Sequence, residues 1–441
     1  MNKQALIEKA LANGIDTIEI YTQKSSKESI EIYDQKVDSF TIAQSGGIAV
    51  RGLYNGKLGN CFLEEDSDDN FDFIINTIKS NATLIENNDI VKIYEGSNQY
   101  PTIESSKLNE TTTEEKINFL KQIETKLSKS DSRIVQVMGT MMETQQVEVN
   151  ITNSLGMDIT KKEEYCVFYA SVLASNDGDN KSAYEIKVTH DINSINVDEY
   201  VNVLKEKVVS KLNAKQVKSD KYKVIIKNDA MCSLLGALTG LFNGENVYKG
   251  ISQLQDKMNT QIFDEKITIL DNPLKKDGYS STPFDDEGIA SKTKVIVDKG
   301  VLKMFLHNQK SAAMMNTEST GNGFKHGYAS SVGISPTNFY IEEGDISFEE
   351  LCKEMNQGLI IDELNGLHAG LNPISTDFSL QASGYVVENG EIVRPVNLIT
   401  VAGNFLNMMK KIENLSNDNY DSLSGVSSPS ILFDNLSISG E

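Results

Sequence analysis

The segment 230–252, AMCSLLGALTGLFNGENVYKGIS, limits the possible folds of this chain more than any other part of the sequence. Its large apolar residues recur at helical spacing and predict one buried helix face, formed by Met231, Leu234, Leu235, Leu238, Leu241 and Phe242. Small residues recur along a second stripe, formed by Cys232, Gly236, Gly240 and Gly244. Because glycine costs about 1 kcal/mol against alanine in a helix, this stripe predicts the close approach of another element.

Chemically reactive side chains are missing from the same segment. No His, Asp, Glu, Lys or Arg lies between Met231 and Asn243. A helix without such groups can pack but cannot bind a metal or transfer a proton. We therefore expect a core helix here.

The order of the predicted elements indicates an α+β protein. A chain of 441 residues is long enough for two or three domains. We expect an N-terminal α/β domain, a middle α/β domain and a β-rich C-terminal domain that contains the glycine-striped core helix. Their predicted bounds are residues 1–86, 108–217 and 221–441, with a polar linker over 87–107.

Local signals mark turns and helix ends within these units. Asn55 and Gly56 stand between alternating apolar runs and predict a β-hairpin. Thr112 and Glu115 fit a capping box and predict the start of a helix. The segments IDTIEIYT and SIEIYDQKV alternate in polarity and predict two half-buried strands. Residues 197–214 predict the helix that closes the middle unit.

Charge and cysteine content exclude several classes of function. The chain has 42 Lys and Arg against 63 Asp and Glu, a formal net charge of -21, which argues against binding to nucleic acid. No apolar run approaches the roughly 20 residues that cross a bilayer, and the first residues lack a signal peptide's apolar core. The four cysteines are far apart and predict buried free thiols. We expect a cytoplasmic protein without membrane or nucleic-acid partners.

Three neighbouring carboxylates form the first candidate site. Asp285, Asp286 and Glu287 lie in the segment PFDDEG. Clustered carboxylates could hold a hard cation or raise one another's pKa. For a single acidic triplet, however, a solvated turn that presents Gly288 is the favoured interpretation.

Histidine offers two further candidates among only four such residues. Ser319 and His326 lie in the glycine-rich segment STGNGFKHG, but a nucleophile and its base must meet in space, which sequence alone does not show. His307, His326 and His368 could converge on a metal, although none has a partner at ligand spacing. Scattered surface histidines are the favoured interpretation.

The chain after Pro283 contains several distinctive motifs, which are DDEG, STGN, SPTNFYIEEGD, NPISTDFSLQASGYVVENGEIVRPV and TVAGNFL. Together they resemble the TldE (PmbA) half of the TldD/TldE family, also called modulators of DNA gyrase. The similarity extends from the N-terminal helix to the final strand, and it implies the same three-domain architecture.

The resemblance also bears on catalysis. In this family the TldD-type subunit carries His-Glu-x-x-x-His on the helix that matches segment 230–252, and two such histidines with a later Cys hold a zinc whose bound water the Glu activates. In this chain Leu235, Gly236 and Gly240 occupy the corresponding positions, and no Cys follows Cys352. The resemblance thus implies no catalytic residue, no cofactor and no metal here, with zinc expected in the TldD-type partner.

The function implied by the resemblance is that of a zinc-free subunit in a heteromeric metalloprotease. Such complexes are expected to degrade or process unfolded or extended peptides, including microcin maturation and antitoxin turnover. Two alternatives remain open: a homodimeric, non-enzymatic protein that binds peptides or regulates, and an independent hydrolase that uses PFDDEG or His326.

Two glycine-rich stretches are candidates for contact with peptide or partner. They lack bulky side chains beside strand-like runs, and an extended peptide can add to a sheet edge through main-chain hydrogen bonds. Ordinary tight turns explain them equally well. The candidate residues are Gly321, Asn322, Gly403 and Asn404.

Overall fold

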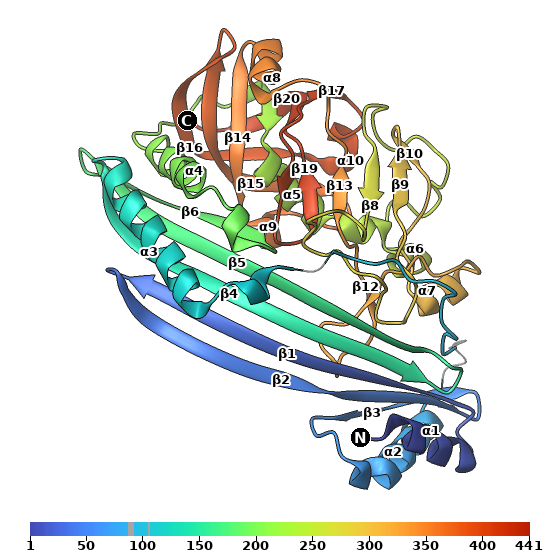
Figure 1. Cartoon of the computed structure of the whole chain (residues 1–441). Helices are drawn as coiled ribbons and strands as arrows, with labels where there is room; N and C mark the ends of the chain where they lie inside the picture. The colour runs from blue at the N-terminus through green and yellow to red at the C-terminus, as the bar shows by residue number, and fades with distance from the viewer. Residues whose placement is uncertain (87–91, 105) are drawn as a thin grey trace.

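A long, curved, antiparallel sheet forms the first half of the molecule (Figure 1). The computed structural model describes residues 1–86, 92–104 and 106–441, so positions 87–91 and 105 of the predicted linker lie outside the described residues. The strand order is β3-β2-β1-β4-β5-β6. The strands are β1 (Thr17–Tyr33), β2 (Lys36–Tyr54), β3 (Lys57–Leu63), β4 (Ile134–Asn153), β5 (Asp158–Asn176) and β6 (Asp179–Thr189).

Turn chemistry sets the register of this sheet. Asn55 and Gly56 have φ angles of 53° and 74°, as a two-residue hairpin turn requires, and the predicted β2–β3 hairpin is confirmed. The two strands predicted around Ile18 and Ile30 are one continuous strand, β1. That prediction was wrong because the polar residues between them pair with strands on both sides, so they stay extended without apolar alternation.

Four helices cover the sheet. They are α1 (Lys3–Ala12), α2 (Phe71–Thr83), α3 (Thr113–Ser130) and α4 (Val197–Val209). Ile18 and Ile20 pack in one core with α1 and α2, while Ile30 and Ile32 pack in another with α3 and α4. The capping box of Thr112 at the start of α3 is confirmed. The sheet is shared by both predicted N-terminal units, because β1 pairs with β4 along most of its length.

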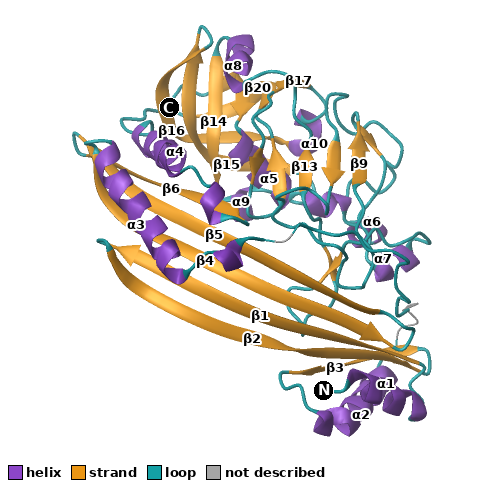
Figure 2. Ribbon diagram, in the orientation of Figure 1, coloured by secondary structure: helices purple, strands orange, loops and turns teal. Residues whose placement is uncertain are grey.

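The second half of the molecule contains a small barrel and a second sheet (Figure 2). In the barrel, β16 pairs with β15 on one side and with β20 on the other, which closes the ring. Its strands are β7 (Asp220–Ile226), β14 (Gly358–Asn365), β15 (Asp377–Glu388), β16 (Glu391–Asn404) and β20 (Ile431–Ser439), with β17 (Ile412–Leu415) paired to β20.

The second sheet and several short elements surround the largest core. This sheet has the order β10-β9-β8-β13-β19-β18. Its strands are β8 (Ile269–Asp271), β9 (Lys294–Asp298), β10 (Val301–Leu302), β13 (Phe339–Ile341), β18 (Tyr420–Asp421) and β19 (Val426–Ser428). The remaining elements are α7 (Gln309–Met314), β11 (Gly323–Phe324), β12 (Gly333–Ile334), α8 (Phe348–Met355), α9 (Leu367–Gly370) and α10 (Phe405–Met408). This mixed helix and strand architecture confirms the predicted fold class.

The glycine-striped segment is buried as predicted, but it is not one helix. It consists of α5 (Asn228–Ala237), a 3₁₀ turn (Thr239–Phe242) and α6 (Gly244–Tyr248). The break arises because the Asn243 side chain accepts hydrogen bonds from two N–H groups of α6 and starts a new helix there. A Cβ on Gly244 would lie 2.2 Å from the His307 ring, so the predicted close approach occurs at this glycine.

None of the helices within residues 1–86, 92–104 and 106–441 is long and apolar enough to cross a bilayer.

Candidate functional site

A cleft of about 1210 Å³ lies against the long sheet. Four neighbouring strands line it with segments 22–26 of β1, 44–48 of β2, 145–148 of β4 and 162–164 of β5, and the loop residues 326–328 line it as well. The ring of Tyr328 packs so closely on β2 that a Cβ on Gly47 would lie 2.3 Å from it. The cleft is therefore a polar surface bordered by extended backbone.

One sheet edge that reaches this cleft is open. Residues 36–47 of β2 pair with β1 on one side, whereas β3 pairs with β2 only from Ile48 onward. Among the described residues no strand occupies the second side of this segment. Phe40 and Ile42 are 45% and 61% exposed there. An open, partly apolar edge of this length is a template for an added strand.

The acidic triplet is buried, so the prediction of a solvated turn is wrong. Asp285, Asp286 and Glu287 are 0%, 5% and 3% exposed. Asp285 accepts hydrogen bonds from the backbone N–H groups of Glu287, Ile289 and Gly323. Burial and the neighbouring Glu287 nevertheless raise the pKa of Asp285 to about 8. These three backbone hydrogen bonds indicate that the Asp285 side chain has a structural role and stabilises the loop.

Asp286 joins the loop to the long sheet. Its carboxylate lies 3.2 Å from Nζ of Lys161 on β5 and accepts a hydrogen bond from the Tyr21 hydroxyl at 3.3 Å. Burial would lower the pKa of Lys161, but Asp286 and Glu163 outweigh it and raise that pKa above its usual value. The triplet is buried because cations from distant strands neutralise it.

Glu287 belongs to a second cluster of charges on β1 and β2. Arg51 donates from Nε to Glu19 at 2.7 Å, and its Nη1 lies 4.0 Å from Glu287. Glu287 also accepts a hydrogen bond from the backbone N–H of Gln309. Burial would lower the pKa of Arg51, but the two carboxylates outweigh it and raise that pKa. A cavity of about 440 Å³ adjoins this cluster.

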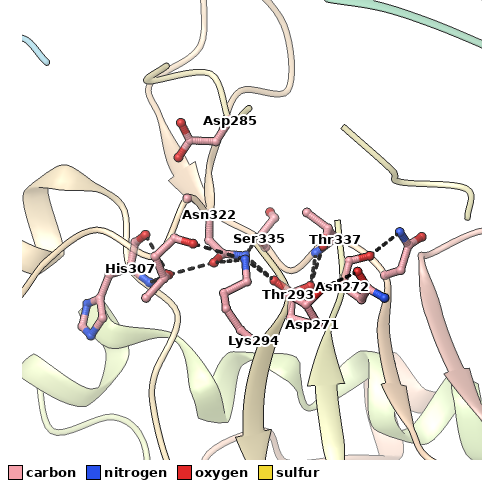
Figure 3. A network of polar contacts seen from close by, with 12 residues as sticks. Asp271, Asn272, Asp285, Thr293, Lys294, His307, Asn322, Ser335 and Thr337 are labelled. Atoms are coloured by element: carbon pink, nitrogen blue, oxygen red, sulfur yellow. Dashed lines mark hydrogen bonds and ion pairs between the residues drawn. The ribbon is translucent and has the colours of Figure 1, made fainter. Parts of the chain in front are cut away.

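Below these loops lies a sealed polar network (Figure 3). Lys294, the first residue of β9, pairs with Asp271, the last residue of β8, at 2.8 Å. Asn322 donates to Asp271 at 2.7 Å and accepts from Lys294 at 2.9 Å. Asp271 also accepts from the hydroxyl of Thr337. The network fixes the ends of both strands and the STGN loop to one another.

The first pair of predicted contact residues lies in this network. Asn322 is fully buried, and both polar atoms of its side chain bond to protein groups. Gly321 is buried with φ +72°, a conformation that favours glycine. Asn322 therefore has no exposed atom to offer a ligand in this arrangement.

The second pair lies in different surroundings at the end of β16. A Cβ on Gly403 would lie 2.9 Å from the Phe378 ring. The Asn404 side chain caps α10 and donates to Ser375 and Asp377. The location of these residues does not test whether either pair contacts a peptide or a partner subunit, so contact at each pair remains a prediction.

The histidines do not converge. His307 is buried beside Ser311, and burial lowers its pKa to about 4. His326 and His368 are exposed on a loop and on α9. His326 lines the cleft, whereas the Ser319 hydroxyl donates to the His307 carbonyl. The favoured prediction of surface histidines is correct for two of these three residues.

The positions matched to the zinc motif do not fit a metal ion. Leu235 is fully buried, and Gly236 and Gly240 bring no donor atom. The nearest polar atom to a Cβ on Gly236 would be the Ser424 hydroxyl, at 3.7 Å. Across the described ranges, no three His, Cys, Asp or Glu side chains are placed to hold a metal together.

Sequence reasoning missed the cations that organise the site. Lys161 lies in the run KKEE, which looks like a solvated face. Arg51 carried a usable signal, because it is a lone charge in the apolar strand GGIAVRGLY, and buried arginines require carboxylate partners.

Comparison with known proteins gives one consistent result. Models of the PmbA/TldA metallopeptidase family match residues 18–82 (domain 1), 106–215 (central domain) and 219–440 (C-terminal domain). The metalloprotease PmbA homolog of Buchnera aphidicola subsp. Baizongia pistaciae is 33% identical over 326 residues, which cover 74% of this chain and 70% of that protein.

Two crystal structures share the fold. A candidate modulator of DNA gyrase from Thermotoga maritima has a TM-score of 0.91 and 31% identity, with 99% of each chain covered. TldE from Thermococcus kodakarensis has a TM-score of 0.90 at 22% identity, with 99% of this chain and 100% of that chain covered, which is a likeness of fold.

Proposed function

The chain belongs to the PmbA/TldD family of metallopeptidases, and we propose that it is the zinc-free subunit of a heteromeric protease, which holds an extended peptide for a TldD-type subunit to cut. One observation carries the proposal. The chain keeps an open strand edge at a large cleft, while the positions matched to the zinc motif are Leu235, Gly236 and Gly240.

The open edge of β2 supports a peptide-holding role. On the side away from β1, residues 36–47 present backbone N–H and C=O groups that no strand of the described chain pairs with, and such groups bind an extended chain whatever its side chains. The exposed Phe40 and Ile42 add apolar contact. The same edge enters the cleft at residues 44–47, so a peptide added to β2 would continue into it. Unfolded or extended peptides are thus the proposed substrate class.

The proposed division of labour rests on donor chemistry. A zinc site needs three protein ligands and a base near the bound water. Leucine and glycine supply none of these, so the reacting zinc is assigned to the TldD-type partner. Peptide that is held by this chain would then be delivered across the subunit interface.

The glycine-rich loops keep their proposed role in contacting peptide or partner. For the first pair that contact would come from Gly321, because Asn322 is fully buried and its side-chain amide is occupied. For Gly403 and Asn404 it would come from the rim of β16 beside α10.

A turnover assay tests the proposal. This chain, a TldD-type subunit and their mixture are each incubated with the same unfolded peptide, and the zinc content of each sample is measured. We expect no zinc and no turnover for this chain alone, and faster turnover by the mixture than by the partner alone. Turnover by the lone chain that is lost in Asp286→Ala or His326→Ala would instead support an independent hydrolase. Peptide binding with no partner effect would support a homodimeric binding protein.

A second assay tests strand addition. N-methylation removes the main-chain N–H donor of a peptide without changing its side chains. Peptides methylated at every second amide are compared with the unmodified peptide by fluorescence anisotropy. We expect one methylation register to abolish binding and the other to be tolerated, since an added strand donates to β2 from alternate residues. Equal binding by all three peptides would exclude addition to β2.

A further inference from the structure

The cavity beside Arg51 is lined by more cations than carboxylates, although the chain as a whole is acidic. It holds about 440 Å³ between β1, β2, β3, the start of α7 at residues 308–310 and the segment 325–332. The charged residues that line it are Glu19, Arg51, Lys92, Glu287, Lys310 and Lys325. Four cations therefore face two carboxylates in a protein whose net charge is -21, and one of the four, Lys310, also lies 3.8 Å from Glu245 outside the cavity lining. Such a local reversal favours an anionic ligand.

Three of the lining side chains have a polar atom without a partner. These atoms are Nη2 of Arg51, Nε2 of Gln309 and Oε2 of Glu19. Within the described parts of the chain no hydrogen-bond partner lies near any of them. Leaving buried donors unpaired is costly, at about 1–3 kcal/mol each, so native sites of this kind are usually completed by a ligand or water. Two of the three are donors, as an anion requires.

The remaining walls suit part of a peptide. Ala49, Leu58, Phe62 and Val332 supply apolar surface, and a cavity of this size accommodates a small ligand or a few residues. A neighbouring cavity of about 460 Å³ shares Tyr21 and Lys325 with it. That neighbour in turn shares Gln23 and His326 with the large cleft. The large cleft, the cavity of about 460 Å³ and the cavity beside Arg51 thus adjoin one another in that order, from the open edge of β2 to Arg51.

We propose that the cavity beside Arg51 is a carboxylate subsite that receives the free C-terminal carboxylate of a peptide lying in the cleft, an inference that rests on the proposed peptide-holding function. Arg51 and Gln309 donate to the carboxylate, and Lys310 and Lys325 supply further positive charge. The unpaired oxygen of Glu19 accepts the N–H of the terminal residue, whose side chain packs against Leu58 and Phe62. A small free carboxylate has the same chemistry and is the other source of ligand.

The electrostatics of Lys325 agree with this assignment. Burial and the neighbouring Arg51 lower its pKa to about 8. The ammonium lies 4.2 Å from the centre of the Tyr21 ring and has a long contact of 3.4 Å with the carbonyl of Tyr328. A bound carboxylate would relieve the repulsion between the two cations.

Binding of paired peptides tests the subsite. A peptide labelled at its N-terminus is prepared as the free acid and as the C-terminal amide, and both are titrated with the full-length protein by fluorescence anisotropy. N-acetyl-leucine and N-acetyl-leucinamide serve as competitors that represent a small carboxylate and its neutral analogue. The variants are Lys310→Gln and Lys325→Gln, because Arg51 supports two buried carboxylates and its removal endangers folding. Lys276→Gln, an exposed lysine outside these cavities, is the matched control.

We expect the free acid to bind at least about tenfold more tightly than the amide, as for a charge-assisted hydrogen bond. Both cavity variants should shrink this preference at least about threefold, while Lys276→Gln keeps it. Equal affinity for acid and amide overturns the subsite and leaves the peptide-holding function intact. Binding of N-acetyl-leucine without binding of either peptide supports the subsite and overturns that function. Absence of binding by every probe overturns both.

Discussion

Lys161 on β5 and Asp286 in the loop before β9 form an ion pair of 3.2 Å that is sealed between the long sheet and the C-terminal loops. Their side chains are 3% and 7% exposed. Lys161 also donates to the carbonyl of Phe284. This pair therefore fastens the DDEG loop to the sheet that carries the open edge and the cleft.

Removing one partner of this pair should be costly. In Lys161→Met the buried carboxylate of Asp286 loses its cation, and such unpaired charges cost about 3–5 kcal/mol. We expect the free energy of unfolding in urea to fall by that amount. Lys162→Met is the matched control, because the neighbouring lysine is 76% exposed and pairs with Glu148 at the surface. That control should lose less than about 1 kcal/mol. Equal losses in the two variants would show that the buried pair does not hold the loop.

His307 should make the protein sensitive to acid. Burial lowers its pKa to about 4 in the folded state, whereas an unfolded histidine has a pKa near 6.5. Between these values the unfolded state binds the additional proton, so stability is present above about pH 6.5 and is lost as the pH falls toward 4. The loss is about 1.4 kcal/mol per pH unit, up to roughly 3 kcal/mol.

His307→Gln isolates this effect, because glutamine keeps a polar group near Ser311 but does not titrate. Unfolding free energies of both proteins are measured at about pH 7 and about pH 4.5. The difference between the proteins should change in favour of the variant at the lower pH. The raised pKa of Asp285 has the opposite effect on the pH dependence of stability. Because both proteins contain Asp285, this contribution cancels when their free energies of unfolding are compared. If the free energies of unfolding of the two proteins change in parallel with pH, then protonation of His307 is not what destabilises the protein in acid.

The apolar part of the open edge should contribute to peptide affinity. Ile42 is 61% exposed on β2, and burying such a side chain contributes about 1.5–3 kcal/mol. We expect Ile42→Lys to weaken peptide binding at least about tenfold in anisotropy titrations. Ile392→Lys is the control, since Ile392 is similarly exposed but lies on the barrel strand β16. A fall in affinity for both variants, or for neither, would place the peptide elsewhere.

The STGN loop should depend on glycine for its backbone. Gly321 has φ +72°, and alanine in that conformation costs about 1–2 kcal/mol. A new Cβ would find ordinary space 3.4 Å from Ile289, so strain and not collision sets the cost of Gly321→Ala. Gly327→Ala, with no positive φ and no atom within 4 Å, should change the unfolding free energy by less than about 0.5 kcal/mol. Equal effects would disprove the strain. Peptide affinity of the folded Gly321→Ala protein then tests the proposed contact separately.

Local chemistry was predictable from the sequence. The Asn55-Gly56 turn and the Thr112 capping box depend on neighbours within a few residues, and both are found as predicted. The core position of segment 230–252 also followed from its composition. Its division at Asn243 did not, because the cap competes with helix continuation and sequence spacing alone does not decide that competition.

The candidate site was predictable only in part. The acidic triplet was noticed, but its burial depends on Lys161 and Arg51, which reach it from other strands of the long sheet. Segment 23–28 of β1 was not predicted as strand, since its extended form is imposed by partners on both sides. Long-range pairing therefore determines most of the site, and only Arg51, a lone charge in an apolar strand, carried a local signal for it.

One measurement addresses the central claim directly. The lone protein is incubated with an N-terminally labelled unfolded peptide and added zinc, binding is followed by anisotropy, and the recovered peptide is analysed by mass spectrometry. We predict that the peptide is bound and recovered intact. New fragments that disappear when a chelator is added would contradict the claim that this chain holds peptide without cutting it, and absence of binding would contradict the claim that it holds peptide at all.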